Sequence, residues 1–403
     1  MPRGKAKKAK PNSVQNRSSV STPHIITAVQ LDAVVRSVEG TLKREIGSTP
    51  DGFPIQFYDT GSYALNWALS GRPLSGGYPG GRVTELYGDP STGKSIAIYH
   101  TIASTQCLGG IPILDDSERA FMKPYAVWFG IDMDRVIFLQ SKRIDEHFEN
   151  CMAIVSKLRS KYGPGFPILV ALDSLGQLMS DREEDKGFSK EDSGRKAMLI
   201  RKGMRLIVPL LKVDERLCWM IASHKSTKFG DFFHPTDSTG GQGVKFQASV
   251  RVDLEERGRV KHPNKESRYI GVNSSAHIVK NKIVTPYRRV WIQILWNLGI
   301  QREYGLVDLM KDENILVPAN RKGYYFLVED DSSREFTAAE FESNDDLKGR
   351  ALKLLEEQEE RITTSKPVVS TEPTCEEPVS ATESEPETEI KSEPKTESDD
   401  KPE

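Results

Sequence analysis

The chain has 403 residues, of which 37% are hydrophobic and 28% charged, and its formal net charge at pH 7 is −2. No run approaches the ~20 consecutive apolar residues that a membrane helix requires, and the basic N-terminus lacks the apolar stretch of a secretory signal. The four cysteines (Cys107, Cys151, Cys218 and Cys375) form no C-x-x-C pair, which argues against a zinc site or a disulfide framework and favours the reducing cytoplasm.

The two ends of the chain differ in charge from its middle. Residues 1–22 are basic and polar, whereas residues 363–403 carry twelve acidic and only four basic side chains. Neither segment offers enough apolar surface to offset the entropy lost on ordering. We therefore expect a basic disordered head at 1–22 and an acidic disordered tail at 363–403.

Residues 23–50 are expected to form an amphipathic helix. Its apolar residues fall on one helical stripe: Leu31, Val34, Val35, Val38, Leu42 and Ile46. Thr27 and Gln30 can form a capping box, and Gly47 can end the helix. Such a helix can pack on its own domain or on a neighbouring subunit, and these residues alone do not decide between the two.

The segment GDPSTGKS matches the phosphate-binding pattern G-x-x-x-x-G-K-[ST]. RVTELYG before it predicts a buried strand, and SIAIYHTIAST after it suits a helix, which is the context that a phosphate site requires. Backbone N–H groups and the helix N-terminus surround the β-phosphate, Lys94 reaches the β/γ oxygens, and Ser95 offers its hydroxyl to Mg²⁺. We therefore expect nucleotide binding by Gly88, Asp89, Pro90, Ser91, Thr92, Gly93, Lys94 and Ser95.

Residues 51–302 are predicted to form an α/β core. Helix-like stretches alternate with five apolar strands, RVTELYG, IPILD, VIFLQ, PILVALD and LCWMIAS, which indicates a mostly parallel sheet. Three further strands, SVRVDLEE, AHIVKNKI and VWIQILW, follow closely and suggest an antiparallel extension. Residues 303–362 are expected to form a small α/β lobe that ends in a charged helix.

Carboxylates follow two of the predicted strands. Asp173 ends PILVALD, where an acid can hold Mg²⁺ through water opposite Ser95. Glu118 follows IPILD and is the candidate that polarises the attacking water. Asp115 and Asp116 are expected simply to terminate their strand.

Two basic stretches lie beyond the parallel strands. HKSTKFGDFFHPTDSTGGQGVKF is a long loop in which lysines lie beside phenylalanines, a composition that suits single-stranded nucleic acid but also a solvated loop. In HIVKNKI, Lys280 and Lys282 are expected on one face of a strand. They either face solvent or reach a γ-phosphate bound by a neighbouring subunit.

Several stretches, taken in order, resemble the RecA family of DNA strand-exchange recombinases, including phage-type members. They are GSYALNWALSGRPLSGGYPGGRVTELYGDPSTGKS, DDSERAFMKPYAVWFGIDMDRVIFLQ, STGGQGVKFQASVRVDLEE, VKNKIVTPYRR and YGLVDLMKDENIL. The resemblance covers about residues 27–360. It implies a RecA-like P-loop NTPase core with an antiparallel extension, an N-terminal assembly helix and a small α/β C-terminal lobe.

The resemblance also implies roles for individual residues. Glu118, Lys94 and His224 would be catalytic, with His224 sensing the γ-phosphate, although Ser223 is the alternative in an ungapped alignment. Tyr125 would stack on adenine, while Lys280 and Lys282 would contact ATP across an interface that includes Lys245 and Phe246. The two DNA loops map to about residues 179–194 and 225–243. The DNA-binding candidates are Arg195, Arg201, Arg205, Lys225, Lys228, Phe232, Gly240, Gly241 and Arg251.

The implied function is an ATP-dependent recombinase that forms helical filaments on single-stranded DNA and exchanges strands with a duplex during recombination and repair. Its cofactors would be ATP and Mg²⁺, and its partners would include single-strand-binding and mediator proteins but no membrane. The expected location is the cytoplasm, at the nucleoid or in a phage host. Two alternatives stay open: a RecA-fold hexameric motor that forms closed rings, and a non-catalytic nucleotide-dependent filament or regulatory protein.

Overall fold

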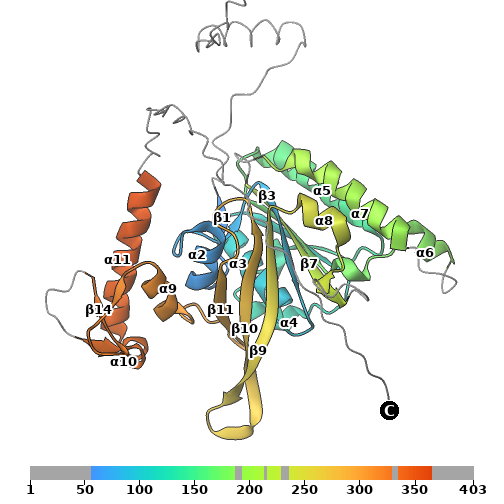
Figure 1. Cartoon of the computed structure of the whole chain (residues 1–403). Helices are drawn as coiled ribbons and strands as arrows, with labels where there is room; N and C mark the ends of the chain where they lie inside the picture. The colour runs from blue at the N-terminus through green and yellow to red at the C-terminus, as the bar shows by residue number, and fades with distance from the viewer. Residues whose placement is uncertain (1–55, 187–192, 213–215, 228–235, 329–334, 365–403) are drawn as a thin grey trace, which may run out of the picture.

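The computed structural model describes residues 56–186, 193–212, 216–227, 236–328 and 335–364. In this part of the chain, a ten-stranded mixed sheet has the order β12-β11-β10-β9-β3-β7-β6-β4-β5, and β8 pairs with β7 (Figure 1). The predicted α/β class is therefore confirmed. The basic head, the helix predicted at 23–50 and the acidic tail from residue 365 lie outside the described residues.

One half of the sheet is parallel and contains the five strands predicted for it. They are β3 (Arg82–Gly88), β4 (Ile111–Asp116), β5 (Ile137–Leu139), β6 (Ile168–Asp173) and β7 (Leu217–Thr227). Every residue of β6 is buried, because helices cover both faces of the sheet. Burial on both faces explains why these strands read as continuous apolar runs rather than as alternating patterns.

The other half is the predicted antiparallel extension. It consists of β9 (Val250–His262), β10 (Lys265–Asn281), β11 (Arg289–Leu295) and β12 (Gly299–Ile300), and β9 joins it to the parallel half by pairing with β3. β10 ends at Asn281, so Lys282 lies just beyond the strand rather than within it. β8 (Thr236–Ser238) adds a short antiparallel pair to the end of β7.

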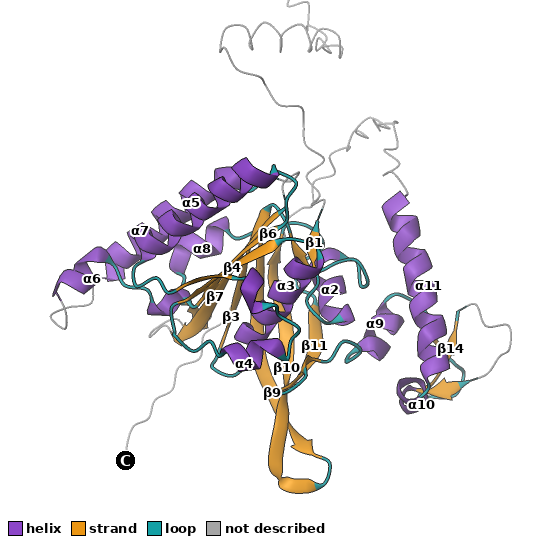
Figure 2. Cartoon of the chain, turned by 180° about the vertical axis from the view of Figure 1, so that it is seen from behind, coloured by secondary structure: helices purple, strands orange, loops and turns teal. Residues whose placement is uncertain are grey.

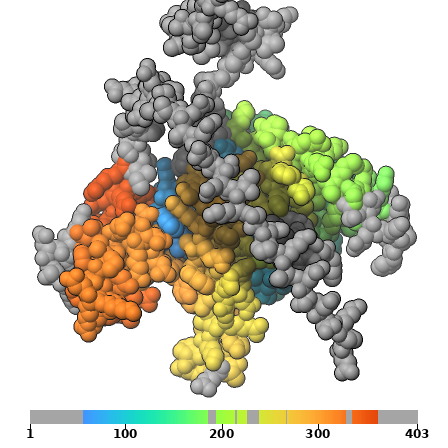
Figure 3. All heavy atoms as spheres, in the orientation of Figure 1, coloured from blue at the N-terminus to red at the C-terminus, as the bar shows by residue number. Residues whose placement is uncertain are grey.

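The β9–β10 hairpin is longer than predicted. β10 begins at Lys265, eleven residues before the predicted AHIVKNKI segment, and the far part of the hairpin projects from the body of the molecule (Figures 1 and 3). Five of its exposed side chains are basic: Arg257, Arg259, Lys261, Lys265 and Arg268. Because water reaches both faces of this arm, no hydrophobic alternation marks it in the sequence.

Helices cover both faces of the sheet (Figure 2). One apolar cluster includes side chains of α2 (Tyr63–Ser70), α3 (Lys94–Cys107) and α4 (Lys123–Val127). A second cluster, on the opposite face, includes side chains of α5 (Ile144–Tyr162), α7 (Ser193–Ile207) and α8 (Gly241–Gln247). The smaller elements are β1 (Phe57–Tyr58), β2 (Tyr78–Pro79), α6 (Asp181–Lys186) and 3₁₀ turns at Met133–Arg135, Leu175–Gln177 and Val208–Leu210.

The C-terminal part contains a three-stranded sheet and three helices. Its elements are α9 (Leu306–Asp312), β13 (Leu316–Pro318), β14 (Tyr324–Leu327), β15 (Phe336–Thr337), α10 (Ala338–Ser343) and α11 (Asp345–Thr364). The first apolar cluster continues into it through Leu306 and Phe341. The Glu359 carboxylate accepts hydrogen bonds from the backbone N–H groups of Leu74 and Ser75 at 2.9 and 3.0 Å, which fixes α11 to the core.

None of the helices in the described ranges combines the length and the apolar character needed to cross a membrane.

Candidate nucleotide-binding site

The phosphate-binding segment connects the end of β3 to the start of α3, as its sequence predicts. Both motif glycines are required by close contacts. A Cβ at Gly88 would lie 2.3 Å from the carbonyl oxygen of Leu254, and one at Gly93, where φ is +102°, would lie 2.1 Å from Cδ1 of Ile294. The loop is thus pressed against β9 and β11, and larger residues at either position would displace it.

A cavity of about 290 Å³ opens in front of this loop. It is lined by Pro90, Ser91, Gly93, Lys94, Ser95, Ile96, Glu118, Asp173, His224, Val272, Ile294 and Trp296. The Lys94 ammonium donates hydrogen bonds to the carbonyl oxygens of Gly88 and Asp89 at 2.9 and 2.8 Å. Burial lowers the pKa of Lys94, although Asp173 and Glu118 act in the opposite direction. A lysine in a concave site at the N-terminus of a helix suits a triphosphate.

Ser95 and Asp173 both line this cavity, and the nearby Ser95 hydroxyl acts to lower the pKa of Asp173. Asp173 is 9% exposed, and burial raises its pKa to about 6 against the effect of the Ser95 hydroxyl. A buried carboxylate of this kind is stabilised by a cation, and a hydroxyl with a carboxylate oxygen is a donor set that Mg²⁺ accepts. These two residues therefore fit the predicted metal site.

Glu118 lies at the centre of a polar group contributed by three strands. Its Oε1 accepts a hydrogen bond from the Ser174 hydroxyl at 2.5 Å and lies 2.8 Å from Nε2 of His224. Burial raises the pKa of Glu118, but the contacts with Ser174, His224 and Lys94 outweigh it and hold the pKa below its ordinary value. The carboxylate is ionised at neutral pH and can accept a proton from water.

The two candidates for the phosphate sensor, Ser223 and His224, lie in different environments. Ser223 is fully buried, and its hydroxyl has no hydrogen-bond partner among the described residues. His224 instead lines the cavity and contacts Glu118. The alternation of side chains along β7 turns these neighbours to opposite faces, which favours His224.

Several residues of this site were not predicted, among them Ser174 and Trp296. Ser174 directly follows the acid that ends β6, and Trp296 directly follows β11 and is 46% exposed at the cavity. The hydroxyl of Tyr125, the predicted adenine-stacking residue, donates to the carbonyl oxygen of Trp296 at 2.7 Å. Tyr125 itself lies beside the cavity rather than in its lining, packed against Tyr99 and Phe129.

Comparison with known proteins identifies the family. The family model of the RecA N-terminal domain matches residues 38–301. A relative named Protein RecA from Paenarthrobacter aurescens (strain TC1) is 31% identical over 279 residues, which are 69% of this chain and 75% of that protein. Another, from Chlorobium chlorochromatii (strain CaD3), is 31% identical over 286 residues, or 70% and 76% of the two chains.

The chain belongs to the RecA family. It is accordingly an ATP-dependent recombinase and a DNA-dependent ATPase that uses ATP with Mg²⁺. The family assignment and the strand–loop–helix geometry agree on the nucleotide site.

The residues predicted for the RecA-type protomer interface lie together, outside the nucleotide cavity. The Lys280 ammonium donates hydrogen bonds to the carbonyl oxygens of Lys245 and Phe246 at 2.8 and 2.9 Å. Phe246 is 70% exposed, and Lys282 is also exposed. Burial lowers the pKa of Lys280 to about 8, with a further contribution from Lys282. We call Lys245, Phe246, Lys280 and Lys282 the lysine surface.

The predicted DNA-binding residues are in several environments. Arg201 and Arg205 are exposed on α7, whereas Arg195 pairs with Asp181 at 2.5 Å. Gly240 and Gly241 lie at the start of α8. Lys228 and Phe232 lie outside the described residues.

Two of the predicted DNA contacts are engaged inside the protein. Lys225 is 9% exposed at its side chain and pairs with Asp253 at 2.7 Å and Glu255 at 3.3 Å. Arg251 is 5% exposed and pairs with Glu85 at 2.6 Å. Carboxylates thus neutralise both cations, and neither presents a free charge to DNA in this conformation. Arg251 thus lies in a buried ion pair in this structure, and its predicted contact with DNA stays a prediction.

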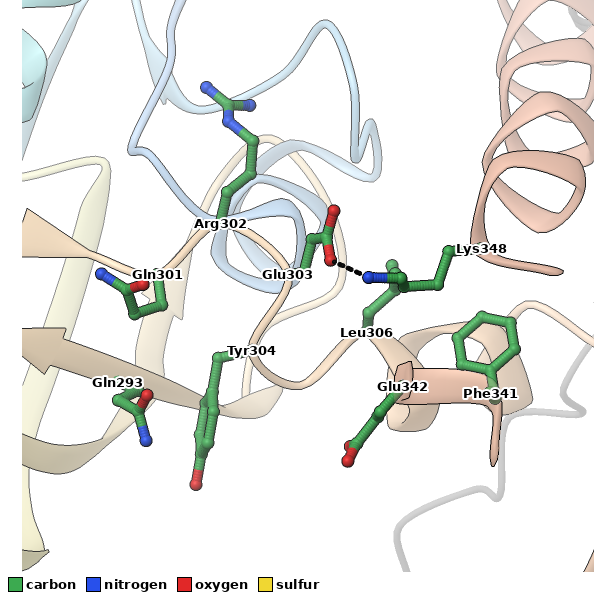
Figure 4. A pocket seen from close by; sticks show the side chains of 9 residues that line it. All are labelled: Gln293, Gln301, Arg302, Glu303, Tyr304, Leu306, Phe341, Glu342 and Lys348. Carbon is green, nitrogen blue, oxygen red and sulfur yellow. Dashed lines mark hydrogen bonds and ion pairs between the residues drawn. The ribbon is translucent and has the colours of Figure 1, made fainter. Parts of the chain in front are cut away.

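A separate cavity of about 420 Å³ lies between the core and the C-terminal part (Figure 4). Its lining includes Gln293, Tyr304 and Glu342, and an ion pair of 3.0 Å joins Lys348 to Glu303 across it. None of its lining residues belongs to the phosphate-binding motif. It therefore takes no part in the nucleotide site.

Proposed function

We propose that protomers of this chain assemble along single-stranded DNA as a helical filament, hold ATP between neighbouring copies, and in that state pair and exchange homologous strands. The observation that carries this proposal is the separation of two surfaces on one protomer. The cavity at the phosphate-binding loop holds Lys94, Glu118 and Asp173, whereas the lysine surface presents cations away from that cavity. Two such surfaces meet on one nucleotide when copies are arranged head to tail.

The chemistry follows from the residues in the cavity. Lys94 binds the β/γ oxygens, and Ser95 with Asp173 holds Mg²⁺, which neutralises charge on the phosphates. Glu118, kept ionised by Ser174 and His224, accepts a proton from the attacking water. The lysine surface of the next copy would complete the site, as arginine fingers do in related phosphoryl-transfer enzymes.

DNA binding is proposed to act on this site through β7. His224 contacts Glu118, and the next residue, Lys225, begins the predicted second DNA loop. Contact of that loop with DNA would therefore act next to His224, the partner of Glu118. DNA affinity should fall steeply with salt, because basic side chains release counterions from phosphates.

The decisive experiment is the double variant Lys280→Ala and Lys282→Ala. It should lose DNA-stimulated ATP hydrolysis while keeping its far-ultraviolet circular dichroism and melting temperature. Lys157→Ala, on the exposed face of α5, is the matched control and should keep full stimulation. Normal DNA-stimulated turnover by the double variant would show that the lysine surface does not contact the neighbour's nucleotide.

Electron microscopy with DNA and ATP separates the proposed helical filament from the closed ring of a hexameric motor. Measuring phosphate release with and without single-stranded DNA separates an enzyme from a non-catalytic binder. The proposed setting is the cytoplasm, either at the nucleoid or in a phage host. Single-strand-binding and mediator proteins act on the same DNA there and are proposed partners.

A further inference from the structure

A fully buried polar pair joins β4 to α5. Asp115 and His147 are both 0% exposed, and Oδ2 of Asp115 lies 2.7 Å from Nδ1 of His147. Oδ1 of Asp115 accepts a hydrogen bond from the backbone N–H of Ser141 at 2.9 Å. The sequence predicts only that Asp115 ends a strand, whereas the structure gives it a partner 32 residues away on the first turn of α5.

This pair replaces apolar packing. Asp115 lies on the same face of β4 as Ile113, which belongs to the apolar cluster beneath α5. The His147 ring packs edge-on against Phe148 and Trp219, and its Nε2 has no hydrogen-bond partner among the described residues. Replacing a buried polar pair by apolar side chains of similar size often leaves a fold equally or more stable. We therefore ask which neighbouring residues the Asp115–His147 pair holds in position.

The groups that follow Asp115 lead directly to the catalytic carboxylate. The Asp116 carboxylate accepts hydrogen bonds from the backbone N–H groups of Ala120 and Phe121 at 3.3 and 3.0 Å. The Ser117 hydroxyl donates to the carbonyl oxygen of Ser174 at 2.6 Å. Asp115 is thus attached to α5, Asp116 to the turn that follows it, and Ser117 to the residue after β6. Glu118, the next residue, has little freedom left.

We propose that Asp115 and His147 are positioning residues for Glu118. The hydrogen bond between Nδ1 and Oδ2 fixes the end of β4 against α5, and thereby places the Glu118 carboxylate beside Ser174 and His224, where it meets the attacking water. The inference rests on the proposed role of Glu118 as the group that accepts a proton from water. Catalytic geometry is sensitive to such supports, because a misplacement of about 1 Å can lower a rate about a hundredfold.

The test compares three substitutions of His147 in the full chain, with ATP, Mg²⁺ and single-stranded DNA. Asn places an amide N–H where Nδ1 lies and should keep kcat for ATP hydrolysis within about threefold. In His147→Gln the amide lies near the position of Nε2 instead, and in His147→Leu the side chain has no hydrogen-bond donor. Both variants should lower kcat by about 10- to 100-fold, with KM for ATP changed less than about twofold. Val155→Ala removes volume from the same buried face of α5 and is the control for packing. It should lower the melting temperature but leave kcat unchanged.

Equal kcat values for the Asn, Gln and Leu variants of His147 would overturn the inference. A fall in kcat in Val155→Ala as large as that in His147→Leu would also overturn it. If the Leu variant does not fold, the Asn and Gln pair decides, because both are polar and of similar size. Glu118→Gln in the same assay separates a failure of the proposed role of Glu118 from a failure of the positioning inference. Should it retain hydrolysis, the role of Glu118 is wrong; should it lose hydrolysis while His147→Leu does not, only the positioning inference fails.

Discussion

The Glu118 carboxylate contacts the His224 imidazole at 2.8 Å across an intervening strand. Glu118 follows β4, His224 lies in β7, and β6 separates the two strands in the sheet. Ser174, which follows β6, completes the contact from the middle. The ends of three adjacent parallel strands thus converge on one carboxylate, and the strand that supplies His224 continues toward the predicted second DNA loop.

Replacing Glu118, the proposed proton acceptor, should separate ATP binding from ATP hydrolysis. Glu118→Gln keeps the size and hydrogen bonding of the side chain but cannot accept a proton. We expect kcat to fall by about 10²- to 10⁴-fold while ATP binding is retained. Single-turnover phosphate release and titration with a fluorescent ATP analogue measure the two quantities. Hydrolysis at more than a tenth of the wild-type rate would exclude Glu118 as the proton acceptor.

Replacing His224 should uncouple hydrolysis from DNA. His224→Ala removes the contact between Glu118 and β7, but leaves Glu118, Ser174 and Lys94 in place. We expect basal hydrolysis to survive and its stimulation by single-stranded DNA to be lost. The ratio of hydrolysis rates with and without DNA checks this, and Ser223→Ala is the control at the adjacent buried position. A wild-type ratio in His224→Ala would contradict the coupling.

Filament assembly should depend on pH through Lys280. Burial lowers the pKa of its ammonium to about 8, and contact with a triphosphate raises it, because phosphate oxygens favour the charged form. Below pH 8 the amine is already protonated, so assembly takes up no proton. Above pH 8 assembly must take one up, so ATP-dependent assembly should weaken as the pH rises.

Lys280→Arg tests this titration, because a guanidinium stays charged across this range. Light scattering of ATP-dependent assembly between about pH 7 and pH 9.5 should show a decline in the wild type and a smaller decline in the variant. The same decline in both proteins would assign the pH dependence to another group.

The buried ion pair between Arg251 and Glu85 should be important for stability. The two residues are register partners on β9 and β3, and removing either would leave a buried charge without its partner. We expect Arg251→Met or Glu85→Leu to lower the free energy of unfolding by about 3–5 kcal/mol. The double variant should lose less than the sum of the single changes. Urea unfolding followed by circular dichroism measures these values, and additive losses would show that the two side chains do not interact.

The local pattern of the sequence was sufficient for the α/β class, the parallel strands and the phosphate-binding loop. Strands buried on both faces are visible as apolar runs. The motif GDPSTGKS can be recognised without knowledge of distant contacts, because its glycines, Lys94 and Ser95 lie in one short segment. Asp173 and Glu118 could be predicted for a similar reason, since each follows a recognisable strand.

Contacts between distant segments were decided only by the tertiary structure. The pairing of Arg251 with Glu85 depends on the register of β9 against β3, and the pairing of Asp115 with His147 depends on a residue 32 positions away. The tertiary structure alone also shows the length of the β9–β10 hairpin and the contact of Ser174 with Glu118. A sequence shows how each segment can fold, but the partner of a polar side chain is set by which segments pack together.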